Sequence, residues 1–148
     1  GCEISIACHV RFVSENAKFA QPEVKLGLIP GWGGTQRLPR IVGKGNATEL
    51  IIGGHMIDAH EAYRIGLANK VFSLENLLEE TIKFGRLILE NGPDCVAESL
   101  RCLNDSVGHS LIEGLNLEVK AFSELFGTVE TTEGLSAFVE KRKPNFRQ

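Results

Sequence analysis

The sequence predicts a mixed α/β fold, in which residues 1–72 hold short strands and helices and residues 73–148 hold helices alone. Two observations support this division. Up to residue 72, short apolar runs are separated by glycine and proline, which is typical of short strands and single helical turns. From residue 73, apolar residues recur at spacings of three and four, which is the period of amphipathic helices.

The first half is expected to begin with a helix over residues 2–8, whose first turn carries Glu3. A carboxylate in that turn interacts favourably with the positive end of the helix dipole. Alternating side chains predict a short strand at residues 9–14, and a second is expected at 18–20. Glu23 then falls in a connecting segment, where functional groups are commonly held.

A glycine-rich turn, Gly31-Trp32-Gly33-Gly34, precedes the next helix. Thr35 is the expected N-cap of this helix, which runs through Ile41 and stops at Gly43. The turn could bring the backbone close to a ligand or could simply reverse the chain, and the pattern alone favours the simple turn. It lacks the spacing of a P-loop or a dinucleotide-binding loop.

Two capping sequences begin the remaining helices of the first half, at Asn46 and at Asp58. In each, a cap residue is followed three positions later by glutamate. We expect the first helix to end at residues 53–54 and the second at Gly66, with a short strand at residues 67–72. The second half then contains four predicted helices, at residues 74–89, 93–107 and 111–126 and around Leu135.

The composition indicates a soluble protein with a sizeable core, since 43% of the 148 residues are hydrophobic. A net charge of -3 gives no general attraction to nucleic acid or to an anionic membrane. No apolar run approaches the ~20 residues of a membrane-spanning helix. The four cysteines form no C-x-x-C pair, so free thiols and no metal site are expected.

Two glutamates, Glu3 and Glu23, lie in apolar surroundings twenty residues apart. A pair of carboxyl groups can supply the base and the acid for adding water to an activated double bond. This role requires a desolvating pocket and mutual repulsion that raise the pKa of at least one group. Taken singly, each glutamate is more simply explained as a solvated carboxylate.

The sequence segments around the glutamates indicate a protein family more specifically than the spacing of the two glutamates does. Residues 1–3 read Gly-Cys-Glu, residues 19–31 read FAQPEVKLGLIPG, and residues 33–38 read GGTQRL. These segments closely resemble the signature region of the crotonase (enoyl-CoA hydratase) superfamily. The resemblance continues through residues 53–71 and 134–142, so it covers essentially the whole chain.

The resemblance implies a C-terminal portion of a larger enzyme, because the chain begins inside the glycine-rich motif of the family. Residues 1–72 would be the end of the crotonase ββα spiral core, and they would carry the catalytic glutamates. Residues 73–148 would be a helical module that drives assembly into a homotrimer or hexamer and contributes to the coenzyme A site.

The activity implied by the resemblance is that of a lyase. It is the syn addition of water to trans-2-enoyl-CoA, which gives 3-hydroxyacyl-CoA in fatty-acid β-oxidation. Glu3 would act mainly as base toward the water, and Glu23 would deliver the proton to the α carbon. Two backbone N–H groups would form an oxyanion hole for the thioester carbonyl. Coenzyme A is part of the substrate, so no separate cofactor is expected.

Family matching also implies a set of substrate contacts. Two members of this set have simpler explanations: Phe138 could be a core aromatic residue, and Lys141 could belong to a solvated run of charges. Trp32 could restrict the length of the acyl chain. The oxyanion donors fall before this chain's glutamate motif, so the isolated 148-residue chain is expected to be inactive. The implied contacts are Gly1, Pro30, Gly31, Trp32, Gly33, Phe138 and Lys141.

Three alternatives remain open. An enoyl-CoA isomerase is disfavoured because relatives that only move the double bond generally keep the residue at Glu23 and lose the one at Glu3. A branched-chain enoyl-CoA hydratase would use the same pair. A non-catalytic oligomerisation fragment would need neither glutamate. The family resemblance places such a protein in the bacterial cytoplasm or the mitochondrial matrix.

Overall fold

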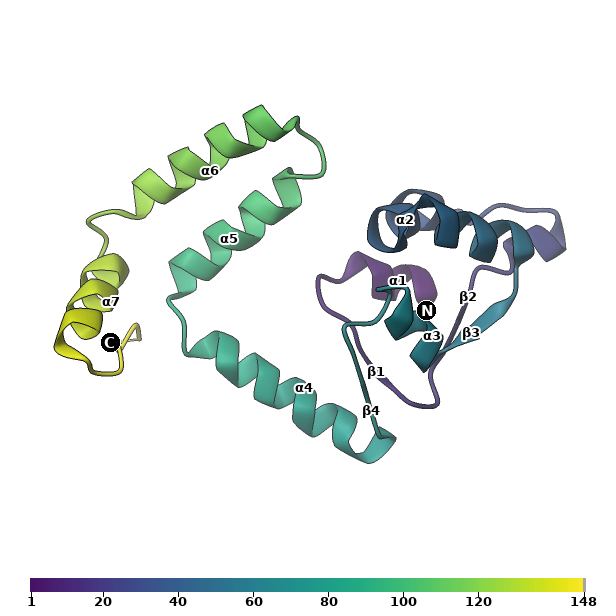
Figure 1. The fold of residues 1–148 in the computed structure, drawn as a ribbon, viewed down its shortest axis with the longest axis horizontal. Helices are drawn as coiled ribbons and strands as arrows, with labels where there is room; N and C mark the ends of the chain where they lie inside the picture. The colour runs from purple at the N-terminus through teal and green to yellow at the C-terminus, as the bar shows by residue number, and fades with distance from the viewer. Residues whose placement is uncertain (148) are drawn as a thin grey trace. The chain divides into compact units, whose positions relative to one another are not determined.

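A computed structural model describes residues 1–147 (Figure 1). It confirms the mixed α/β fold, with short strands confined to the first half. Its contacts divide the chain into two compact units, which meet between Ile82 and Lys83. This point lies inside α4 (Leu74–Leu89), ten residues beyond the predicted division. The roles expected for residues 1–72 and 73–148 stay predictions.

The first unit begins with a helix and two short strands at the places that the sequence predicts. The first strand is shorter than expected and does not include residues 9–11. Arg11 explains the difference, because its backbone N–H donates to the side-chain Oδ1 of Asn69 at 2.7 Å instead of to a neighbouring strand. The elements are α1 (Cys2–Ala7), β1 (Phe12–Ser14), β2 (Lys18–Ala20), the 3₁₀ helix η1 (Glu23–Leu26) and α2 (Gly34–Gly53).

Two pairs of strands connect distant parts of this unit. Strand β1 pairs in parallel with β4 (Lys70–Phe72), so that Val13 lies beside Val71. Strand β2 pairs in antiparallel with β3 (Met56–Asp58), so that Phe19 lies beside Ile57. The sequence analysis missed β3, because three residues between a glycine pair and a helix cap are too few to show a period.

The core of the first unit lies along α2. Leu38 is 1% exposed and is joined there by Val42 and Leu50. Two alanines of α3 (Ala59–Arg64), Ala59 and Ala62, are completely buried against this cluster. Their small side chains permit close packing of helix α3 against the neighbouring strands.

Helix α2 differs from the prediction at its start and in its middle. Its N-cap is Gly33, which has a left-handed φ of 93°, whereas Thr35 was the expected cap. The two helices predicted on either side of Gly43 form one kinked element, in which Gly43 has φ 79° and ψ 156°. Glycine adopts both conformations without the steric penalty of a Cβ atom.

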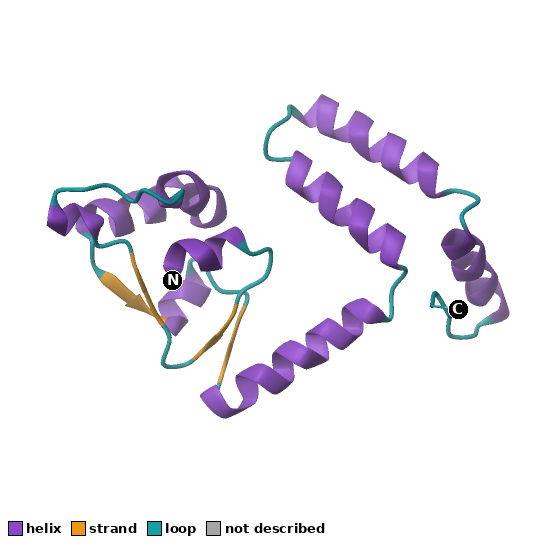
Figure 2. Cartoon of the chain, turned by 180° about the vertical axis from the view of Figure 1, so that it is seen from behind, coloured by secondary structure: helices purple, strands orange, loops and turns teal. Residues whose placement is uncertain are grey.

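Beyond α4, helices joined by loops are the regular elements of the second unit among its described residues (Figure 2). It comprises α5 (Pro93–Asp105), α6 (Leu111–Leu125) and α7 (Val129–Glu140). Ser110 caps α6 in a reciprocal capping box with Glu113. The last helix is longer than predicted because it begins at Val129, directly after the cap residue Thr128.

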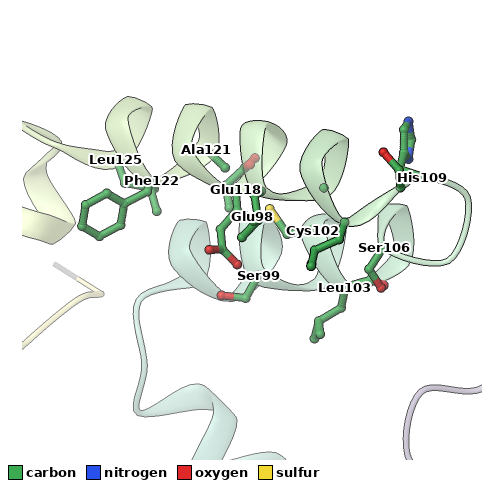
Figure 3. Close-up of a pocket in the computed structure, with 14 residues that line it drawn as sticks. Glu98, Ser99, Cys102, Leu103, Ser106, His109, Glu118, Ala121, Phe122 and Leu125 are labelled. Carbon is green, nitrogen blue, oxygen red and sulfur yellow. The ribbon is translucent and has the colours of Figure 1, made fainter.

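Helices α5 and α6 pack side by side and leave a groove of about 650 Å³ between them (Figure 3). Both helices contribute to its lining, including Cys102 of α5 and Ala121 of α6. Many large apolar side chains of this unit are exposed, among them Leu111 and Phe122. The described residues alone therefore leave a wide apolar surface uncovered.

Candidate active site

Glu3 is held by the start of α2. It lies in the first turn of α1, and its Oε1 accepts hydrogen bonds from the backbone N–H of Trp32 at 3.1 Å and of Gly34 at 2.8 Å. Gly34 is the first residue of α2, so the carboxylate lies at the positive end of that helix. Two donors on one oxygen fix the side chain without using Oε2.

The close approach of Glu3 to α2 depends on glycine at position 34. A Cβ atom there would lie 2.7 Å from Gln21 Nε2, 2.8 Å from Glu3 Oε1 and 2.9 Å from Pro30 Cβ. Gln21 is only 2% exposed, so it has little room to move. Gly34 is therefore required by the space around it, since a larger residue would overlap the carboxylate.

The turn before α2 is held by Arg37. Its guanidinium Nη1 donates to the carbonyl oxygen of Trp32 at 2.8 Å. The backbone N–H of Arg37 donates to the carbonyl of Gly33 at 2.8 Å, so the first turn of the helix is anchored as well. Trp32 thus has its N–H bound to Glu3 and its C=O bound to Arg37.

Glu23 occupies the first turn of η1, after Pro22. The backbone N–H of Leu28 donates to the Glu23 carbonyl at 3.1 Å, which closes the turn. The Oε2 atom of the side chain is buried and has no hydrogen-bond partner among residues 1–147. A buried carboxylate oxygen is costly unless a donor satisfies it. This atom is therefore suited to a donor from solvent or from a ligand.

The thiol of Cys2 is partly buried and lies against Gln21. Burial raises the pKa of the Cys2 thiol, and the negative charges of Glu3 and Glu23 raise it further. Gln21 Nε2 lies 3.8 Å from Cys2 Sγ, so a buried amide packs against the same thiol.

The other predicted site residues fall into two groups. Within the first unit, Pro30 is buried beside Gly34, whereas Gly1, Gly31 and Trp32 are exposed. The Trp32 side chain is 84% exposed although its backbone is bound on both sides. The structure thus places the loop 30–33 directly beside Glu3.

Phe138 and Lys141 lie in the second unit, at the end of α7. Phe138 is 83% exposed, so it is not the core aromatic residue that the sequence left open. Lys141 is the C-cap of α7 and has a left-handed φ of 55°. Their part in a substrate site stays a prediction.

Sequence reasoning missed Gln21, Gly34 and Arg37 as members of the site, and it gave no role to the thiol of Cys2. All four lie in the sequence motifs around the two glutamates, and this position was the one indication that they belong to the site. Their roles arise from contacts among residues that lie between positions 2 and 37 of the sequence. The spacing of residue types does not reveal these contacts.

A family model described as "Enoyl-CoA hydratase/isomerase" matches residues 1–148 of the chain. The chain belongs to the enoyl-CoA hydratase/isomerase family. This membership confirms the resemblance to the crotonase superfamily, and it accounts for the shared motifs around the two glutamates.

Relatives within the enoyl-CoA hydratase/isomerase family match nearly all of this chain. Crotonyl-CoA hydratase of Syntrophomonas wolfei is 46% identical over 146 residues, which are 99% of this chain and 56% of that protein. Mitochondrial enoyl-CoA hydratase of Pongo abelii is 43% identical over 147 residues, which are 99% of this chain and 51% of that protein. The chain thus spans about half the length of the curated relatives it matches.

A solved member of the family has the same backbone arrangement. The crystal structure of enoyl-CoA hydratase from Bacillus anthracis matches with a TM-score of 0.96 and 40% identity, over 99% of this chain and 57% of that one. Within residues 1–147, no helix is both long enough and apolar enough to cross a bilayer. The same described part holds no cluster of three His, Cys, Asp or Glu residues placed to bind a metal ion.

Proposed function

We propose that the protein carrying this chain is an enoyl-CoA hydratase, a lyase that adds water in syn fashion to trans-2-enoyl-CoA to give 3-hydroxyacyl-CoA. The observation that carries the proposal is the clamp of two N–H groups on Glu3 Oε1, together with the buried Glu23 Oε2, which has no hydrogen-bond partner among residues 1–147. Relatives whose names specify crotonyl-CoA or enoyl-CoA hydration support this choice of reaction.

Glu3 is proposed as the base. Its Oε1 is engaged by Trp32 and Gly34, so Oε2 is the oxygen that takes a proton from water. The two N–H groups fix the orientation of the carboxylate, which leaves Oε2 available to the water. The water oxygen then forms its bond to C3 of the enoyl group, and the electrons of the double bond move toward the thioester.

Glu23 is proposed as the acid. Its buried Oε2 carries the proton that is delivered to C2, which completes the addition. The charge that develops on the thioester oxygen would be stabilised by backbone N–H groups in an oxyanion hole. Acid and base assistance of this kind typically accelerates a reaction by about 10²- to 10⁴-fold.

Substrate contacts are proposed for the residues beside Glu3 and for two residues of the second unit. Coenzyme A belongs to the substrate, so the reaction needs no other cofactor. The helical second half is proposed to support a homotrimer or hexamer, and β-oxidation in the bacterial cytoplasm or mitochondrial matrix is the proposed setting. The contacts are Gly1, Pro30, Gly31, Trp32, Gly33, Phe138 and Lys141.

The experiment is a comparison of crotonyl-CoA hydration by the full-length protein and its variants. We expect Glu3→Gln and Glu23→Gln each to lower kcat by about 10²-fold or more, because each removes one proton-transfer group. Glu15→Gln is the matched control, since Glu15 is an exposed glutamate outside the site. The 148-residue chain alone is expected to show no turnover.

If Glu3→Gln keeps the wild-type rate, the two-glutamate assignment is wrong. An isomerase would be recognised by a different result. The wild-type protein would then convert trans-3-enoyl-CoA to trans-2-enoyl-CoA, and it would not hydrate crotonyl-CoA.

A further inference from the structure

We propose that Arg37 is a positioning residue for Glu3, and this inference rests on the proposed function of Glu3 as the base. Arg37 does not bind Glu3. It binds the Trp32 carbonyl at 2.8 Å, and the N–H of the same residue binds Glu3 Oε1 at 3.1 Å. Arg37 thereby fixes the turn that presents the N–H donors to the carboxylate.

The geometry requires the turn to be held, because Oε1 receives two N–H groups from residues two apart. The donors on Trp32 and Gly34 can converge on one oxygen only while the backbone between them keeps its conformation. Gly33 lies between them with a left-handed φ of 93°. Because glycine populates several backbone conformations readily, contacts with neighbouring residues are what hold the turn in this one.

Arg37 and Gly33 fit each other as a pair. A Cβ atom on Gly33 would overlap Arg37 Nη1 and would lie 3.0 Å from Cζ. The guanidinium therefore occupies the space that the missing side chain leaves. The backbone N–H of Arg37 also donates to the Gly33 carbonyl at 2.8 Å. The backbone and the guanidinium of Arg37 are therefore both bound to the same turn.

The test compares Arg37→Met with Arg40→Met in the full-length protein. Arg40 lies on the same helix, but its Nη1 donates to the backbone carbonyl of Gln36 within that helix. We expect Arg37→Met to lower kcat for crotonyl-CoA by about tenfold, since a charged hydrogen bond that aligns the base is lost. Arg40→Met should keep the wild-type values.

Two further measurements distinguish positioning from general damage. Gly33→Ala should lower kcat in the same way, and the Gly33→Ala, Arg37→Met double variant should be no worse than the more damaging single variant, because both act through one turn. In crystal structures, Arg37→Met should lengthen the distance from Trp32 N to Glu3 Oε1, whereas Arg40→Met should leave it unchanged.

Equal kcat values for Arg37→Met and Arg40→Met would overturn the inference, as would a loss of activity with the Trp32 to Glu3 distance unchanged. Failure of the proposed function gives another pattern. The wild-type protein would then hydrate no enoyl-CoA, while the crystal structure of Arg37→Met would still show Glu3 released from the turn.

Discussion

Glu3 owes its position to the backbone of a neighbouring turn and not to an acid or base that binds it directly. The backbone N–H groups of Trp32 and Gly34 bind its Oε1, and Arg37 holds the turn on which Trp32 lies. The motifs that resemble the crotonase superfamily pointed to the two carboxylates, and their catalytic roles stay predictions. The sequence could not predict the donors, because a backbone N–H is the same at almost every residue.

Substitution of Gly34 tests this dependence most simply. We expect Gly34→Ala to lower kcat for crotonyl-CoA and to destabilise the protein by about 1–3 kcal/mol, because the added Cβ would overlap Glu3, Gln21 and Pro30. Enzyme kinetics and urea unfolding provide the two measurements.

Gly45→Ala is the matched control in the same helix. A Cβ atom there would meet no neighbour within 4 Å. Alanine has the higher helix propensity, so this variant should keep its activity and gain up to about 1 kcal/mol of stability. If Gly34→Ala retained wild-type activity and stability, the close approach of Glu3 to α2 would not be needed.

At the scale of elements, most helices and strands lie near their predicted places, whereas β3 and the continuation of α2 across Gly43 were not predicted. The three long helices α4, α5 and α6 lie where apolar spacing placed them, since each offers several turns of pattern. Strand β3 was missed because three residues show no period. The start of α2 was predicted two residues late, because the left-handed Gly33 caps it in place of the hydroxyl of Thr35.

The end of α7 provides a pH-dependent contact. Arg142 donates to both carboxylate oxygens of Glu133, at 2.6 and 2.8 Å, and the backbone N–H of Asn145 donates at 2.7 Å. The hydrogen bonds from Arg142, followed by that from Asn145, lower the pKa of Glu133 to about 2. This value lies below the ~4.3 of an unperturbed glutamate, so the folded state favours the ionised form.

The sign of the pH effect follows from this lowered pKa. The contribution of Glu133 to stability is complete above about pH 5 and is lost as the pH falls toward about 2. The difference in unfolding free energy between the wild type and Glu133→Gln, measured in urea at several pH values, should shrink over that window. Glu124→Gln, which breaks an exposed pair with Lys120, should change stability little. A Glu133→Gln difference that stays constant down to pH 2 would contradict this account.

At the scale of the whole molecule, the chain holds one part of the proposed chemistry and leaves much apolar surface exposed. It spans about half the length of its curated relatives. In the second unit, side chains such as Val129 and Phe138 are more than four-fifths exposed, at 84% and 83%. Composition and period predicted these helices, but a pattern along one chain does not specify what covers their outer faces.

The most direct test of the central claim is a crystal structure of the full-length protein with bound 3-hydroxybutyryl-CoA. We expect the hydroxyl oxygen on C3 to lie within about 2.6–3.2 Å of a carboxylate oxygen of both Glu3 and Glu23, because that oxygen comes from the water they share. A bound thioester whose C3 hydroxyl contacts neither carboxylate would contradict the account.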